Sequence, residues 1–247
     1  MDASSTSDEA ALGGRMALPW AVALGFSGVA LFFAGVYTYA TRGEVFVTGL
    51  DRRMGEILAR RAESLAASGD VDAALAAYSK ALAAPFEHAS QRATWQREYG
   101  RLLLAQGQYT DALAQLDSAV RATPTDLKVR GLLCEFYRQT AQYDSLEDAA
   151  RNWLTLAQAA GSGVNVSQAQ YHLGLAYENT GKLDDALAAY AQGHEADPSG
   201  VNAYHEAELL IRLGRREDAL PLLESYVKIG EGARLADARK RLEELRK

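Results

Sequence analysis

Beyond residue 55, apolar side chains recur at intervals of three and four residues, the spacing that gives an α-helix one hydrophobic face. Each such stretch ends at a short turn with a glycine or another small residue, and a second apolar helical stretch follows. The turn and the second stretch together form a block that recurs at 69–82, 107–120, 181–194 and 214–227, with a weaker copy at 141–154. Because the alternating pattern of strands is lacking, the sequence predicts an all-α array of helix–turn–helix units.

The turns of these units are marked by one small residue each. In chain order they are Gly69, Gly107, Ala141, Gly181 and Gly214. Extra residues near 85–92 and at 161–163 are expected to form longer loops between units. The last segment, 233–247, has apolar residues on one face and charges elsewhere, which predicts a helix that caps the array with a polar outer surface.

The small, aromatic and proline positions of these units resemble those of the tetratricopeptide repeat family. The fourth unit carries the pattern best, at Leu173, Gly174, Tyr177, Gly181, Ala186, Tyr190 and Pro198. The third unit departs most, since Cys134 stands at a small packing position and Trp153 replaces a late alanine. The resemblance covers 56–232 and implies an α–α solenoid of about five helix pairs.

A separate segment precedes the repeats. Residues 17–40 carry no charge and would span about 36 Å as a helix, which is enough to cross a bilayer. This predicts one transmembrane helix, with a polar N-terminal tail at 1–16 and a juxtamembrane linker at 41–55. Small residues spaced four apart could pack this helix against another in the membrane, namely Ala17, Ala21 and Gly25.

A cleaved signal peptide is the alternative for 17–40, because Thr38 and Ala40 would suit a cleavage site. The apolar stretch is longer than the usual signal peptide core, which favours a retained anchor. We therefore expect a single-pass protein of a bacterial inner membrane. The flanking charges leave the side of the membrane that carries the repeats open.

Composition and motifs limit the chemistry. The net charge of −6 argues against a nucleic-acid partner, and the single cysteine, Cys134, argues against a disulfide or a cysteine-based metal site. The four histidines show no metal-ligand spacing, and phosphate-binding and nucleophile motifs are lacking. We therefore expect no catalytic residue, cofactor, metal or small-molecule substrate, and an enzyme is the least favoured class.

The family resemblance implies a concave groove lined by the first helix of each unit. Counted from the turns, its candidate binding residues are Arg97, Arg101, Lys128, Arg138, Tyr171, Asn179, Tyr204 and Arg212. The middle of such a groove is basic and its C-terminal part is aromatic and aliphatic. It would suit a peptide segment with acidic groups and apolar anchors, although the same charges could be ordinary solvated helix surface.

Together these features predict a non-catalytic, membrane-anchored scaffold or adaptor that binds a peptide segment of a client protein. Two alternatives stay open. One is an exported chaperone-like or assembly factor of the cell envelope. The other is a structural accessory subunit of a larger membrane complex.

Overall fold

The computed structural model describes residues 43–86, 88–230 and 232–246, with side chains from Arg53 onward. This part of the chain forms eleven helices and no strand, so the predicted all-α architecture is confirmed. The helices are α2 (Gly43–Ala67), α3 (Val71–Ala83), α4 (Ala89–Ala105), α5 (Tyr109–Ala122), α6 (Leu127–Gln139), α7 (Tyr143–Ala159), α8 (Gly163–Asn179), α9 (Leu183–Ala196), α10 (Asn202–Arg212), α11 (Arg216–Ile229) and α12 (Leu235–Leu245).

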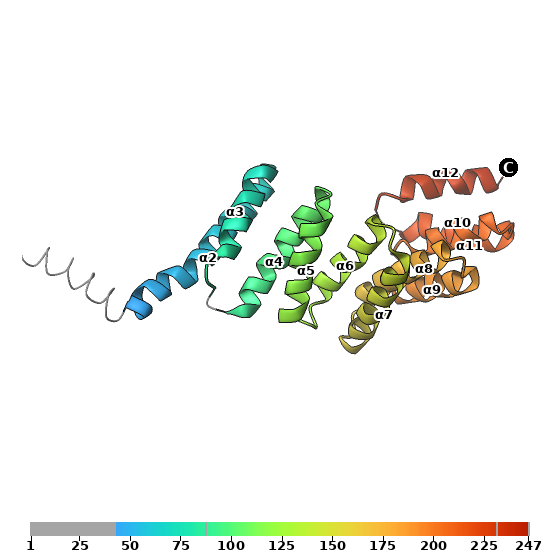
Figure 1. Cartoon of the computed structure of the whole chain (residues 1–247). Coiled ribbons are helices and arrows are strands. Elements are labelled where there is room, and N and C mark those ends of the chain that lie inside the picture. The colour runs from blue at the N-terminus through green and yellow to red at the C-terminus, as the bar shows by residue number, and fades with distance from the viewer. Residues whose placement is uncertain (1–42, 87, 231, 247) are drawn as a thin grey trace, which may run out of the picture.

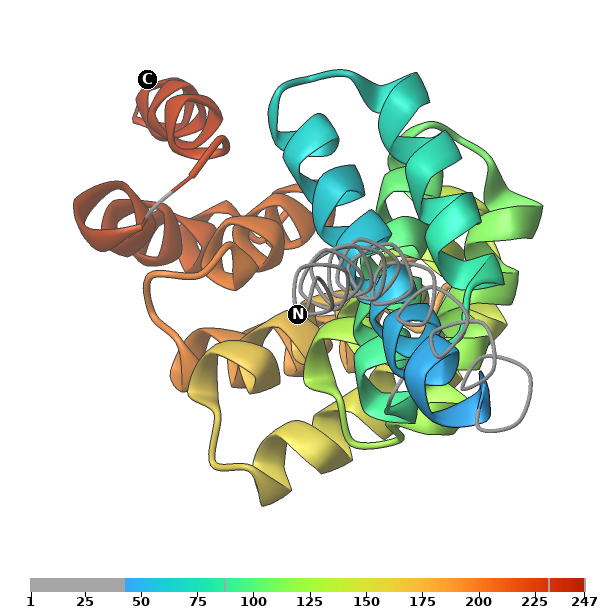
Figure 2. The same ribbon diagram turned by 90° about the vertical axis from the view of Figure 1, so that its left-hand side faces the viewer.

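The helices form five consecutive pairs, α2–α3 to α10–α11, and α12 follows (Figure 1). Each helix packs mainly on its neighbours in the sequence, as in a solenoid. Figure 2 shows the pairs wound around a common axis. The first helices of successive pairs also contact one another, from α2 to α10, and so they line one face of the array.

The predicted anchor at 17–40 and its Ala17, Ala21 and Gly25 lie outside the described residues. Within the described ranges, no helix has the length and apolar character needed to cross a bilayer. The predicted linker at 41–55 is helical from Gly43 and continues without a break into the first repeat as α2.

The turns inside the pairs share one hydrogen-bonding pattern. After α4, the Gly107 amide donates to the carbonyl of Leu104 at 3.0 Å and the Gln108 amide to that of Leu103 at 2.9 Å. Gly107 has a φ of +71°, which glycine adopts without steric cost, and the turn satisfies carbonyls left free at the helix end.

The same turn also joins α7 to α8, between two repeats. Gly161 has a φ of +63° and donates to Gln158, while Ser162 donates to Ala157, each at 3.0 Å. The expectation of a longer loop at 161–163 is therefore wrong. The extra residues lengthen both helices, and α7 and α8 pack as extensively as the helices within a pair.

Small residues let the paired helices approach closely. A Cβ on Gly174 of α8 would lie 2.3 Å from the Tyr190 ring of α9, so only glycine fits there. In the third pair the close contact lies three residues further from the turn on each helix, where Trp153 of α7 packs over Gly131 of α6. This shift of the large and small positions explains why the third repeat departs from the pattern of the others.

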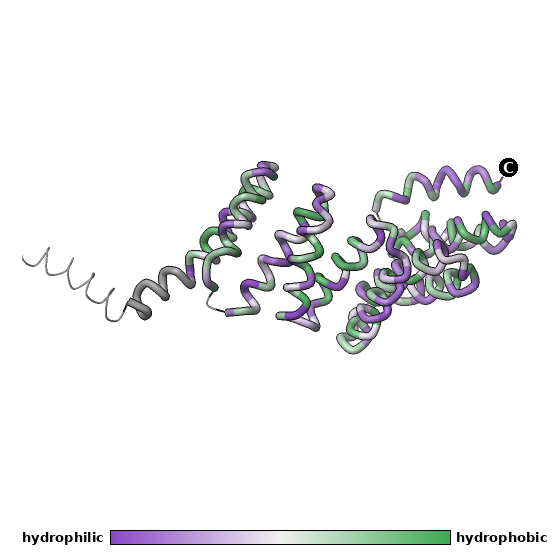
Figure 3. The backbone as a smooth tube through the Cα atoms, in the orientation of Figure 1, coloured by the Kyte–Doolittle hydropathy of each residue, from purple (hydrophilic) through white to green (hydrophobic). Residues whose placement is uncertain are grey.

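The C-terminal helix α12 covers the last pair. Ala238 and Leu242 are buried in the core that α10 and α11 share with it, and the rest of α12 is largely hydrophilic (Figure 3). The Arg241 guanidinium donates to both carboxylate oxygens of Glu208 on α10, at 2.8 and 3.0 Å. The segment predicted to cap the array, 233–247, thus contains a helix with one buried apolar side and a polar outer side.

Candidate functional site

The face lined by the first helices contains a pocket of about 530 Å³. Its walls come mainly from three consecutive repeats, α4, α6 and α8, with Trp153 contributed by α7 and Val201 by the N-cap of α10. We call it the groove pocket. Its lining residues are Arg97, Glu98, Arg101, Leu127, Lys128, Gly131, Leu132, Trp153, Asn165, Gln168, Tyr171, His172 and Val201.

Four of the predicted groove residues line this pocket, namely Arg97, Arg101, Lys128 and Tyr171. Arg97 and Arg101 lie one helical turn apart on α4, which places both side chains on the same face. Lys128 stands in the first turn of α6, next to the Asp126 N-cap. The structure therefore brings the predicted basic residues of the second and third repeats together with Tyr171 of the fourth.

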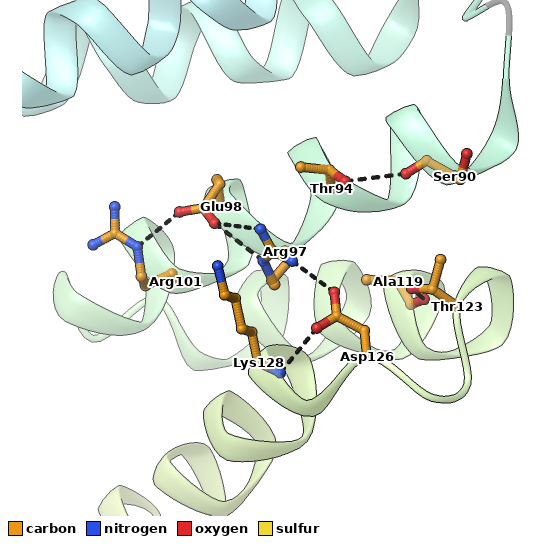
Figure 4. A network of polar contacts seen from close by, with 9 residues as sticks. All are labelled: Ser90, Thr94, Arg97, Glu98, Arg101, Ala119, Thr123, Asp126 and Lys128. Carbon is orange, nitrogen blue, oxygen red and sulfur yellow. Dashed lines mark hydrogen bonds and ion pairs between the residues drawn. The ribbon is translucent and has the colours of Figure 1, made fainter. Parts of the chain in front are cut away.

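The two arginines are held by carboxylates of the same protein (Figure 4). Arg97 pairs with Asp126 at 2.6 Å and with Glu98 at 3.0 Å, and Arg101 pairs with Glu98 at 3.0 Å. Asp126 also accepts a hydrogen bond from the Lys128 amide at 2.9 Å, which fixes the start of α6. This network joins two repeats and orients both guanidinium groups.

Lys128 differs from its basic neighbours. Its side chain is exposed, and among the described residues no carboxylate forms an ion pair with its ammonium group. The charged side chains that line the pocket are three cations, Arg97, Arg101 and Lys128, and one carboxylate, Glu98. The pocket thus has a positive excess, and Lys128 is the cation most available to a ligand.

Aromatic rings form the deeper part of the groove pocket. Because Gly131 has no side chain, the Trp153 ring packs directly against it, and a Cβ at this position would lie 2.9 Å from the ring. Trp153 is 3% exposed, and its ring centroid lies 5.9 Å from that of His172, which touches Tyr171 in turn. Burial lowers the pKa of His172 to about 4, although Glu135 acts in the opposite direction, so the imidazole is neutral near pH 7.

The other four predicted groove residues do not line this pocket. Arg138 pairs with Glu135 on its own helix, and Arg212 pairs with Glu178 across the α8–α10 contact. Asn179 donates to the carbonyl of Leu175 at 2.8 Å. Tyr204 is only 9% exposed and belongs to the core of the last repeat.

Sequence reasoning did not place Trp153 or His172 at the groove. Trp153 was missed because it belongs to a second helix, which lies behind the first helices in this kind of repeat. The sequence did contain a signal for this placement. A tryptophan replaces the usual alanine at position 153, and a glycine, Gly131, stands in the first helix of the same repeat, where it leaves room for the ring.

The described residues contain no cluster of histidine, cysteine and acidic side chains that could hold a metal ion. Cys134 is fully buried, and burial raises the pKa of its thiol to about 12, so the nucleophilic thiolate is scarce at neutral pH.

Comparison with known proteins identifies the repeats. The tetratricopeptide repeat family matches residues 59–126 and 143–201, and a second description of the same repeat matches 103–160. No curated protein is significantly similar to the chain.

Similar solved structures share the fold at low identity. A MamA protein is 20% identical over 71% of this chain and 91% of its own, with a TM-score of 0.59. YrrB, described as a TPR protein with an unusual peptide-binding site, is 24% identical over 75% of this chain and 91% of its own, with a TM-score of 0.54. TTC0263, a thermophilic TPR protein in Thermus thermophilus, is 21% identical over 77% of this chain and 98% of its own, also with a TM-score of 0.54. Since the family match covers more than half of the sequence, the chain belongs to the tetratricopeptide repeat family.

Proposed function

We propose that this protein is a non-catalytic, membrane-anchored scaffold that holds a partner protein by binding one of its peptide segments in the groove pocket. The observation that carries the proposal is the composition of that pocket, in which three repeats combine a positive excess with an aromatic interior. YrrB, a structural relative, is itself described as having a peptide-binding site.

The pocket favours a peptide that has an acidic residue near an apolar one. A carboxylate would pair with the free ammonium group of Lys128, and with Arg101 at the rim. An apolar side chain would enter the pocket beside Gly131 and contact Leu132 and Trp153, which line it. This assigns the acidic and apolar anchors of the ligand to separate parts of one pocket.

Anchoring by residues 17–40 in a bacterial inner membrane completes the proposed function. A tethered groove keeps its ligand near the bilayer and raises the effective concentration of a partner that is also at the membrane. Alkaline extraction and protease treatment of sealed spheroplasts test this part. The anchor predicts a full-length chain that stays in the membrane, whereas a released product beginning at Thr41 would show a cleaved signal peptide.

Site-specific photo-crosslinking in intact cells tests the groove. A photoreactive residue at Gln168, an exposed position in the pocket, should give a defined protein adduct, and one at Ala114 on the outer helix α5 should not. Lys128→Glu should lower the Gln168 adduct about tenfold by replacing attraction with repulsion. Lys80→Glu, an exposed charge reversal on α3, should leave it unchanged.

Adducts that are equal at Gln168 and Ala114, or a Gln168 adduct that Lys128→Glu does not weaken, would contradict groove binding. The stoichiometry of the partner separates the alternatives. A partner that co-purifies at a fixed ratio would favour an accessory subunit. Repeats outside the cytoplasm with transiently bound clients would favour an envelope assembly factor.

A further inference from the structure

A second pocket, of about 390 Å³, lies between α9, α10 and α11, and we call it the α9–α11 pocket. Glu206 and Leu210 of α10 contribute to it. Glu206 is two residues from the predicted groove residue Tyr204, which places it about 160° around the helix from that position. The α9–α11 pocket therefore opens away from the groove.

The walls of the α9–α11 pocket are mainly apolar, with Leu187, Ala188 and Ala191 from α9 and Pro221 and Leu222 from α11. Glu206 is a carboxylate in this apolar setting, and no basic side chain among the described residues forms an ion pair with it. Such a carboxylate is costly to desolvate without a partner. It is therefore a preformed position for a cation that comes from outside the chain.

The neighbouring charges do not neutralise Glu206. Arg215, which also lines the pocket, is paired with Asp218 at 2.7 Å, so these two cancel and a net negative charge remains. Burial raises the pKa of Glu206 to about 7, with Arg215 acting in the opposite direction and Glu195 adding to the rise. Pro221 has no N–H, so it also leaves the carbonyl of Glu217, one turn earlier, without its usual helical donor.

We propose that the α9–α11 pocket binds a lysine or arginine side chain of a partner protein, with the alkyl stem on the apolar walls and the cationic end on Glu206. Charge complementarity selects this occupant, because an apolar side chain would bury the carboxylate unpaired. The site is independent of the groove pocket, which has the opposite charge. The protein could then hold a basic segment on one side and an acidic segment on the other.

This binding would depend on pH. The cation pairs with the ionised form of Glu206, so binding drives the release of a proton wherever Glu206 is protonated in the free protein. Affinity should therefore fall as the pH decreases through 7. Between pH 8 and pH 6 the ionised fraction, and with it the affinity, should fall by about tenfold.

Methyl NMR of the full chain in detergent micelles tests the proposal with two probes, N-acetyl-lysinamide and N-acetyl-argininamide. Each should shift the methyl resonances of Leu187, Ala191, Leu210 and Leu222 at pH 8, with at least fivefold weaker affinity at pH 6. N-acetyl-norleucinamide has the stem without the charge and should produce no shift. The same titrations should fail with Glu206→Gln, which keeps the shape of the side chain, and succeed with Glu63→Gln, an exposed control on α2 far from the pocket.

Two results would overturn the proposal. One is binding that survives Glu206→Gln or that the norleucine probe reproduces, because the carboxylate would then not recognise the ligand. The other is a shift of the same methyl resonances with protein concentration in the absence of a probe, because the occupant would then be a second copy of this chain. Intact helix spectra of Glu206→Gln would separate lost binding from lost folding.

Discussion

Ala141 is the one non-glycine residue in the described part of the chain that has a positive φ, at 54°. It occupies the turn position that glycine holds in the other four pairs, and it makes the same hydrogen bonds to the preceding helix. A side chain in this left-handed region costs about 1–2 kcal/mol from the contact between Cβ and the backbone. The third repeat thus keeps a strained turn between α6 and α7.

Ala141→Gly should therefore raise the free energy of unfolding by about 0.5–1 kcal/mol, after the greater entropy of glycine in the unfolded chain is deducted. Urea denaturation followed by circular dichroism measures the change. The control is Ala160→Gly, at an exposed helix end with a φ of −83°, where no strain is relieved and stability should not rise. Equal gains in the free energy of unfolding in both variants would show that the turn at Ala141 is not strained.

At the residue scale, the family resemblance, counted from the turns, predicted Arg97, Arg101, Lys128 and Tyr171 as groove residues, and the structure places all four at one pocket. The resemblance could not predict which charges stay free. Arg97 is neutralised by Asp126, 29 positions along the chain, and only the packing of α4 beside α6 brings them together. Lys128 stands out because no described carboxylate pairs with it, a property that no local pattern contains.

Between elements, the closest helix contacts depend on residues that lack a side chain. The α8–α9 pair is the clearest example, because the Tyr190 ring fills the space that a Cβ on Gly174 would occupy. Tyr190 is fully buried and donates a hydrogen bond to Glu178 at 3.0 Å, so the ring cannot easily move aside. The pair is therefore sensitive to a single methyl group.

Gly174→Ala should lower the free energy of unfolding by about 1–3 kcal/mol through overpacking, as thermal or urea denaturation would show. A double-mutant cycle with Tyr190→Ala provides the control. Once the ring is absent, Gly174→Ala should cost less than about 0.5 kcal/mol. If the losses of stability from the two substitutions simply add in the double variant, the Tyr190 ring is not what excludes a side chain at position 174.

The elements themselves were largely predictable, because helix period and turn glycines are local signals. The helix at 43–55 and the tight turn at 161–163 were not predicted. At 161–163 the sequence Gly-Ser-Gly is typical of a flexible loop, although Gly161 follows Ala141 by twenty residues and precedes Gly181 by twenty. That equal spacing indicates two lengthened helices on either side of a tight turn. The extra residues between the third and fourth repeats add about one helical turn to each helix instead of forming a loop.

Across the whole molecule, buried ionisable groups link stability to pH. Burial lowers the pKa values of His172 and His205 to about 4, below the ordinary value of about 6.5. As the pH falls from 6.5 to 4, the unfolded chain binds these protons before the folded protein does, so stability decreases. Glu206, with its pKa raised to about 7, acts in the opposite direction between pH 7 and its ordinary value near 4.5.

His172→Gln should therefore reduce the loss of stability between pH 7 and pH 4.5 by about 2 kcal/mol relative to the unmodified protein. Urea denaturation at a series of pH values measures this difference. At pH 8 both the unmodified protein and the variant carry an uncharged residue at position 172. The difference between their free energies of unfolding at this pH therefore gives the pH-independent cost of the substitution. Parallel pH profiles would show that His172 titrates normally in the folded protein.

The lengthened hairpin of α7 and α8 has a consequence for local unfolding. Repeat arrays open from their ends, since a terminal repeat has one neighbour while a central repeat has two. The tight contact between α7 and α8 joins the third and fourth repeats into one unit with a common core. The amide hydrogens of these central helices should therefore be the last to exchange. The aromatic residues of the groove pocket belong to the same helices, so fraying at either end of the solenoid would leave the pocket in place.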